Sequence, residues 1–106
     1  MVILSNAFSI SMLPEFPANI IFEKLSDEEV KNLLAGGFRS TVGHSDVARI
    51  IAERIGMEVP VCRDKTILGK NDILVVAQYI GPRLPEGATT LPEGARIEFF
   101  KVYESE

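Results

Sequence analysis

The alternation of hydrophobic and polar positions divides the chain into strand-like and helix-like segments. Residues 2–8 (VILSNAF) begin with apolar, β-branched side chains and predict a buried strand. Residues 18–25 (ANIIFEKL) predict a second strand, and residues 96–105 (RIEFFKVYES) predict the last one. Residues 72–81 (DILVVAQYIG) are apolar at successive positions. We therefore expect them to form a central strand that is buried on both faces.

Two segments follow the helical period instead. Ser26 and Glu29 have the spacing of a capping box, and the glycines at 36–37 would end the helix that starts there. The second helix is expected from about residue 45 to residue 55, with its apolar side chains on one side and Gly56 as its stop.

The remaining segments predict little regular structure. Residues 38–42 favour a short extended piece, and residues 58–68 favour a loop with one short strand. Residues 82–95 form a Pro/Gly-rich loop in which the sequence LPEGA occurs twice, at 84–88 and at 91–95.

The resulting order, β-β-α-(β)-α-(β)-β-β, predicts an α/β (α+β) fold: a mixed sheet flanked by helices on one face. We expect one domain over residues 1–106. The chain has 106 residues, of which 46% are hydrophobic and 25% charged. A chain of this length buries about two-thirds of its unfolded surface, which is enough for one core without a metal or disulfide.

Charge and composition exclude several classes of function. The formal net charge of −4 argues against binding to long nucleic acids. Cys62 is the only cysteine and His44 the only histidine, so a disulfide or zinc site is not expected. Neither GxxxxGK[ST] nor GxGxxG occurs, and no segment resembles a membrane span or a signal peptide. We expect an intracellular, cytoplasmic protein without a metal or cofactor.

His44 is the clearest candidate for chemistry, because histidine can give or take a proton at neutral pH. Gly43 before it permits the close approach of a ligand. The N–H groups near Ser45 and Asp46 would begin a helix and could hold a phosphate. In the alternative interpretation, His44 is a solvent-facing residue and Ser45 or Asp46 caps the helix.

Other polar residues stand where predicted strands end. Asn6 and Ser9 follow the first apolar run, and Gln78 follows ILVVA. They could line a cleft or serve as ordinary edge residues. Arg83 can grip phosphate oxygens with two hydrogen bonds, and Glu86 could orient a sugar hydroxyl. The alternative for these two is an exposed ion pair.

Three motifs resemble a known family. LSNAFSISML (4–13), GHSD (43–46) and VVAQYIGPRLPEG (75–87) occur in this order over most of the chain. Together they resemble the viral anti-CRISPR ring nucleases and their small phage and bacterial relatives. Those enzymes degrade cyclic tetra-adenylate, the second messenger of type III CRISPR immunity.

The resemblance implies a role for each matching residue. His44 would be the general acid, and the arginine and glutamate of the family's RL-EG segment fall on Arg83 and Glu86. The family's substrate contacts fall on Asn6, Ser9 and Gln78. Alongside these, Gly43 and Ser45 are our own candidates for holding a phosphate. The resemblance also implies a metal-free reaction, linear products with 2′,3′-cyclic phosphate ends, and a homodimer whose two-fold cleft binds the ring. Such a protein would act in a cell or within an infected host cell.

The chain also departs from the family pattern. The spacing from Gln78 to Arg83 is one residue longer, and Pro92 and Gly94 shorten a segment that is often helical in relatives and could cover the ligand. The second LPEG makes Glu93 a rival to Glu86. Two other functions stay open on the residues alone. One is a non-catalytic module that binds a cyclic nucleotide, and the other is a protein-interaction domain that uses the LPEGATTLPEGA loop.

Overall fold

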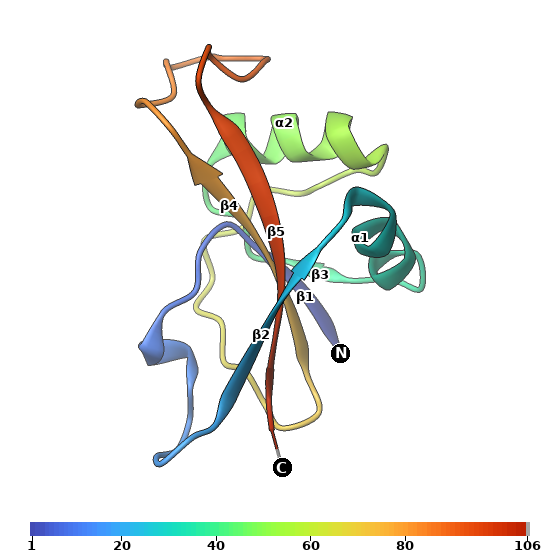
Figure 1. The fold of residues 1–106 in the computed structure, drawn as a ribbon, viewed down its shortest axis with the longest axis vertical. Coiled ribbons are helices and arrows are strands. Elements are labelled where there is room, and N and C mark those ends of the chain that lie inside the picture. Colours follow the sequence, from blue (N-terminus) through green and yellow to red (C-terminus); the bar gives the residue numbers. More distant parts are fainter. Residues whose placement is uncertain (106) are drawn as a thin grey trace.

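The computed structural model describes residues 1–105. A five-stranded mixed sheet has the strand order β2-β5-β4-β1-β3, and two helices accompany it (Figure 1). The strands are β1 (Val2–Ser5), β2 (Ile20–Leu25), β3 (Arg39–Ser40), β4 (Ile73–Ile80) and β5 (Arg96–Glu104). The helices are α1 (Asp27–Leu34) and α2 (Ser45–Ile55), with a short 3₁₀ turn η1 (Ile10–Met12). The α+β fold expected from the sequence is confirmed.

Strand β4 lies in the middle of the sheet, as its apolar sequence predicts. It is parallel to β1, with Leu4 opposite Val75, and antiparallel to β5. Strand β1 is also parallel to β3 on its other side, whereas β2 pairs with β5 in antiparallel fashion. The sheet therefore contains three neighbouring strands, β4, β1 and β3, that all run in the same direction.

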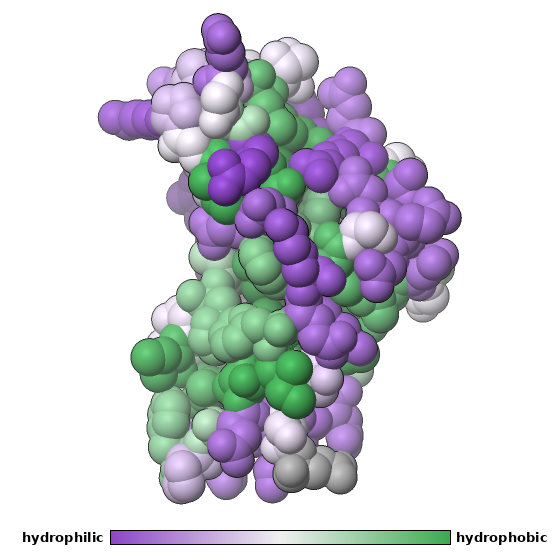
Figure 2. Space-filling view, viewed as in Figure 1, coloured by the Kyte–Doolittle hydropathy of each residue, from purple (hydrophilic) through white to green (hydrophobic). Residues whose placement is uncertain are grey.

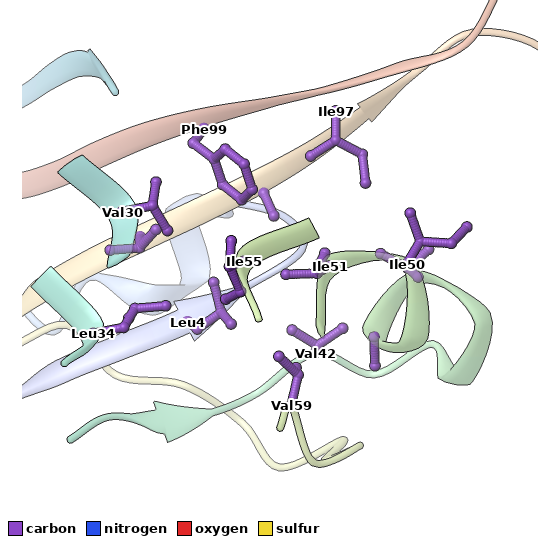
Figure 3. Packing of buried hydrophobic residues seen from close by; sticks show 14 residues of the cluster. Leu4, Val30, Leu34, Val42, Ile50, Ile51, Ile55, Val59, Ile97 and Phe99 are labelled. Carbon is purple, nitrogen blue, oxygen red and sulfur yellow. The ribbon is translucent and has the colours of Figure 1, made fainter. Parts of the chain in front are cut away.

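The main core lies between the helices and one face of the sheet. Val30 of α1 and Ile51 of α2 are both 0% exposed, and Phe99 of β5 is 1% exposed. Figure 3 shows these side chains meeting between the two layers. Helix α1 begins with the expected capping box, because Ser26 Oγ accepts from the Glu29 N–H at 3.2 Å and Glu29 Oε1 accepts from the Ser26 N–H at 3.0 Å.

One arginine ties α2 to the rest of the fold. Arg54 donates two hydrogen bonds to the carboxylate of Asp27 on α1, at 3.0 and 2.9 Å. It donates a third, at 2.8 Å, to the carbonyl of Ile97 on β5. These bonds lower the pKa of the Asp27 carboxyl below its ordinary value. The C-terminal end of α2 is thereby anchored to both layers.

The opposite face of the sheet carries a smaller apolar cluster. Leu74, Val76 and Val102 are buried there under Leu68 and the segment around Phe8. Part of this face stays open to solvent. Figure 2 shows hydrophobic side chains gathered over the half of the molecule where β2 lies. The exposed apolar side chains include those of Ile10, Phe16 and Phe22, and Phe22 contacts Phe8 on this face.

Two predicted segments are shorter than expected. The strand predicted over 2–8 ends at Ser5, whose hydroxyl donates to the carbonyl of Ala7 at 3.0 Å as the chain leaves the sheet. The short strand expected within 58–68 is reduced to a single bridge between Val42 and Val61. Within the described part of the chain, no helix has the length and apolar character needed to cross a membrane.

Candidate functional site

The candidate site lies at the carboxyl ends of the three parallel strands. Asn6 follows β1, His44 follows β3 after a short extended link, and Arg83 follows β4. Parallel strands end at the same edge of a sheet, so residues far apart in the sequence meet there. This edge is the usual place for ligands in open sheets that contain parallel strands.

A groove of about 790 Å³ opens at this edge, a volume in the range of small-molecule sites. It is lined by His44, Ser45, Asp46, Val47, Arg63, Tyr79, Gly81, Arg83, Leu84, Pro85 and Glu86. The groove brings together His44, Ser45, Arg83 and Glu86, four of the residues that were candidates from the sequence. The rival residue Glu93 does not line it.

His44 itself caps α2. Its Nδ1 accepts a hydrogen bond from the backbone N–H of Val47 at 3.3 Å. The alternative in which Ser45 or Asp46 caps the helix is therefore wrong. Because Nδ1 is the acceptor, the neutral ring carries its proton on Nε2. The ring itself is exposed and lines the groove, so it is accessible to a ligand.

Two side chains hold the backbone of Gly43, the residue before His44. Asn6 Oδ1 accepts from the N–H of Gly43 at 3.4 Å, and Arg63 Nε donates to the carbonyl of Gly43 at 2.9 Å. The stem of Arg63 lies so close that a Cβ on Gly43 would be 3.3 Å from Arg63 Cγ. The sequence predicted that Gly43 permits close approach to the backbone. In the structure, the side chain of Arg63 makes such an approach.

Arg63 also lines a second hollow, of about 340 Å³. Asn6 and Gly43 line it, together with the cationic side chain of Lys65. Arg63 and Lys65 were not expected from the sequence, because they lie in an irregular loop without a motif. The bridge between Val42 and Val61 and the bond from Arg63 to Gly43 hold that loop beside the site.

The loop after β4 forms the other wall of the groove. The hydroxyl of Tyr79 donates to the carbonyl of Pro82, which holds the start of the loop. Within residues 1–105, Arg83 and Glu86 form no ion pair with each other or with another residue. The ion pair considered in the sequence analysis is therefore absent, and both side chains are free to bind a ligand.

The cations and the carboxylates of the site are not equally available. Arg63 and Arg83 are exposed in the groove. Asp46 is only 6% exposed, and its Oδ2 accepts from the N–H of Gly87 at 2.8 Å. Since this acidic charge is already paired, the two guanidinium groups outnumber the one unpaired carboxylate, that of Glu86, and the groove favours an anionic ligand.

Two predicted substrate contacts lie elsewhere. Gln78 lines a separate apolar pocket of about 260 Å³ with Phe8 and Phe22, because alternate residues of a strand face opposite sides and its neighbour Tyr79 faces the groove. Ser9 caps η1 through the N–H of Ser11 and lines neither hollow. In this single chain these two side chains do not join His44.

Among residues 1–105, no group of three or more His, Cys, Asp or Glu side chains is arranged to hold a metal ion. The chemistry available in the groove is that of an imidazole, two guanidinium groups, a carboxylate and backbone N–H groups. These groups suit the binding of a phosphodiester and the transfer of a proton.

Known proteins match the chain in two comparisons. The model of the STIV B116-like family matches residues 2–100. Among solved structures, B116 of Sulfolobus turreted icosahedral virus (STIV) is 28% identical with a TM-score of 0.80, and the match covers 96% of this chain and 97% of that chain. No curated protein matches. The family match includes every residue that lines the groove.

Proposed function

Since the chain belongs to the STIV B116-like family, we propose that it is a metal-independent ring nuclease that cleaves cyclic tetra-adenylate. Its products would be linear, with 2′,3′-cyclic phosphate ends, and cleavage would switch off type III CRISPR signalling. The proposal starts from the resemblance of the three motifs to the ring nucleases. The observation that carries it is the groove in which His44, Arg83 and Glu86 lie together.

The reaction uses the nucleophile that RNA already contains. The 2′-oxygen attacks the adjacent phosphorus, the bond from phosphorus to the 5′-oxygen breaks, and the 2′-hydroxyl proton passes to solvent. Holding these three atoms in line contributes several kcal/mol, on the order of the known effects of orientation. Glu86 and Ser9 would position the ribose, and Asn6 and Gln78 would contact the ring. Since Ser9 and Gln78 lie outside the groove of one chain, their contacts would require the second subunit.

His44 supplies the proton that the departing 5′-oxygen needs. Its Nε2 is the nitrogen available to a ligand, because Nδ1 is occupied by the N–H of Val47. A ring that acts as an acid carries protons on both nitrogens, so the capping bond to Val47 is given up in that state. Losing a cap costs about 1 kcal/mol. Proton donation contributes roughly 10²–10⁴-fold in rate, which outweighs this cost.

The phosphoryl charge is held by the cations of the groove. Arg83 has no carboxylate partner within residues 1–105 and can give two parallel hydrogen bonds to phosphate oxygens. Arg63 already uses Nε to hold Gly43, which leaves its two terminal nitrogens for a neighbouring phosphate. The N–H of Ser45, in the first turn of the 11-residue helix α2, adds a backbone donor.

The active form would be a homodimer. Each chain has one histidine, and a two-fold pair presents two copies of the site to a ring that shares this symmetry. The side chain of Phe22, which is 55% exposed beside Phe8, supports the formation of such a pair. Light scattering should give twice the monomer mass for the wild type, whereas Phe22→Asp should give a monomer.

The test uses labelled cyclic tetra-adenylate in the presence of EDTA. We expect the wild type to cleave it to products with cyclic phosphate ends, and His44→Ala to lose about 10²–10⁴-fold in rate. A second substrate carries sulfur in place of each bridging 5′-oxygen. A thiolate leaves without being protonated, so His44→Ala should cleave this substrate almost as fast as the wild type does.

Three results would contradict the proposal: inhibition by EDTA, cleavage by His44→Ala at the wild-type rate, or tight binding without product. The last of these would identify a module that only sequesters the ring. If His44→Ala remained equally slow on the sulfur substrate, His44 would not be the acid.

A further inference from the structure

The carboxylate of Asp46 is buried beside the groove and holds the opposite wall. Its Oδ2 accepts from the N–H of Gly87 at 2.8 Å, and its Oδ1 is 3.5 Å from Nη1 of Arg49. The same nitrogen of Arg49 donates to the carbonyl of Ala88 at 3.5 Å. A buried carboxylate without such partners would be strongly unfavourable. Asp46 and Arg49 thus bind the loop after β4 to the first turn of α2.

The bonded N–H belongs to a tight turn that carries Glu86. The N–H of Ala88 donates to the carbonyl of Pro85 at 3.1 Å, and Gly87 has φ +79°, as the third residue of a type II turn requires. Asp46 therefore holds the N–H of the peptide bond between Glu86 and Gly87. Fixing that peptide fixes the direction in which Glu86 leaves the turn.

The second LPEGA provides an internal comparison. It forms the same turn, since Ala95 N–H donates to the carbonyl of Pro92 at 3.0 Å and Gly94 has φ +81°. In the described chain, however, no side chain accepts from the N–H of Gly94. The turn does not need a carboxylate in order to form. The contact from Asp46 is specific to the copy that lines the groove.

We propose that Asp46 is a positioning residue: through Gly87, it holds Glu86 in the groove that His44 also lines. This inference rests on the proposed nuclease function and concerns the same groove. His44 and Asp46 are two positions apart on one helical turn, so a single rigid element sets both the acid and the facing loop. The inference also explains how an acidic residue is accommodated in a phosphate site, because its charge is directed to Gly87 and Arg49.

The first experiment needs no substrate. Amide hydrogen exchange, followed by NMR in the ligand-free protein, compares the wild type with Asp46→Ala and Asp46→Asn. We expect exchange at Gly87 to become at least ten-fold faster in Asp46→Ala and about three-fold faster in Asp46→Asn, which keeps an oxygen acceptor. Gly94, the matched glycine, and Ile51, in the middle of α2, should not change.

Equal exchange at Gly87 in the wild type and in both variants would overturn the inference, as would equal acceleration at Gly94. If Asp46→Ala does not fold, the nearly isosteric Asp46→Asn still tests the inference, because its amide exchange at Gly87 can be compared with that at Gly94. The outcome does not depend on whether the protein cleaves a ring.

The second experiment measures cleavage in a single turnover with saturating cyclic tetra-adenylate. We expect Asp46→Ala to slow the chemical step about ten-fold with little change in ring affinity, and Asp46→Asn to recover most of the rate. Because Asp46 acts through Glu86, Asp46→Ala combined with Glu86→Ala should be no slower than Glu86→Ala alone. Multiplying effects would overturn the positioning role. If the wild type does not cleave the ring at all, the proposed function fails, and the exchange experiment still tests the contact.

Discussion

The Nδ1 atom of His44 accepts a hydrogen bond from the backbone N–H of Val47 at 3.3 Å, so the only histidine of the chain closes the first turn of α2. A helix begins with four N–H groups that lack partners inside the helix, and a capping side chain satisfies one of them. The same ring lines the groove. It therefore caps the helix and, in the proposed function, also donates a proton, and these two roles can be separated by substitution.

His44→Asn should keep the structural task and lose the chemical one. Asparagine is among the best capping residues, so the free energy of unfolding should stay within a few tenths of a kcal/mol of the wild type, whereas His44→Ala should lose about 0.5–2 kcal/mol. Both variants should lose ring cleavage. Urea unfolding and the cleavage assay measure the two effects. An active His44→Asn would show that the imidazole is needed only as a cap.

Substitutions of Arg83 and Arg63 should affect cleavage and ring binding differently. Arg83→Lys keeps the charge but not the paired hydrogen bonds, so we expect cleavage to remain roughly ten-fold or more below the wild type. Arg63→Ala should weaken ring binding, because it removes both a cation and the brace on Gly43. Arg39→Ala, outside the groove, is the matched control. Calorimetry and single-turnover rates distinguish the effects, and equal losses in all three variants would argue against a specific phosphate site.

The two LPEGA turns permit a controlled pair of substitutions. Gly87 and Gly94 have nearly the same positive φ, +79° and +81°, and a Cβ at either position would meet nothing within 4 Å. Gly87→Ala and Gly94→Ala should therefore cost similar stability, about 1–2 kcal/mol from backbone strain. Only Gly87→Ala should also slow cleavage, because only that turn carries a groove carboxylate. Thermal unfolding and the cleavage rate provide the comparison, and equal rates would contradict it.

The bond between Asp27 and Arg54 should make stability depend on pH. Arg54 lowers the pKa of Asp27 below 3.8, so the ionised pair stabilises the fold above that value and the contribution is lost as the pH falls through the folded-state pKa. Because both side chains are partly in solvent, we expect Asp27→Asn to cost only about 0.5–1 kcal/mol at pH 7.

The difference between the wild type and Asp27→Asn should shrink towards zero as the pH is lowered from 5 towards 2. Urea titrations across that range measure it. Asp64→Asn serves as the control, because Asp64 is 75% exposed and lies 3.8 Å from its arginine. A difference that stays constant down to the lowest pH would show that Asp27 acts through something other than its charge.

Local sequence patterns predicted the elements of the fold well. The capping box at Ser26 and the glycine stop at Gly56 depend on bonds within one or two turns, and both helices lie where these signals place them. The four longer strands are also where apolar runs predict them. The strand predicted over 2–8 is too long. Nothing in its composition distinguishes the residues that pair with neighbouring strands from those that follow Ser5 and leave the sheet.

The site was predicted only in part, because it depends on contacts between residues that are far apart in the sequence. His44, Arg83 and Glu86 stand in motifs, and the groove brings them together. Arg63 stands in no motif, and its place beside Gly43 depends on the irregular path of a loop. The contact between Asp46 and Gly87 was not expected either, because its donor is a backbone N–H 41 residues away that no side-chain pattern could indicate. Contacts to the backbone leave little trace in a sequence.

Among residues 1–105, strand β2 pairs with one other strand, β5, which is the last of the five in sequence order. During synthesis, Ile20 to Leu25 must therefore wait for residues 96–104 to leave the ribosome before their backbone can be paired. Closing so long a stretch of chain is entropically costly and slow. The nascent protein should thus spend much of its synthesis with an unpaired apolar segment at risk of aggregation, and chaperone demand should peak just before the final strand emerges.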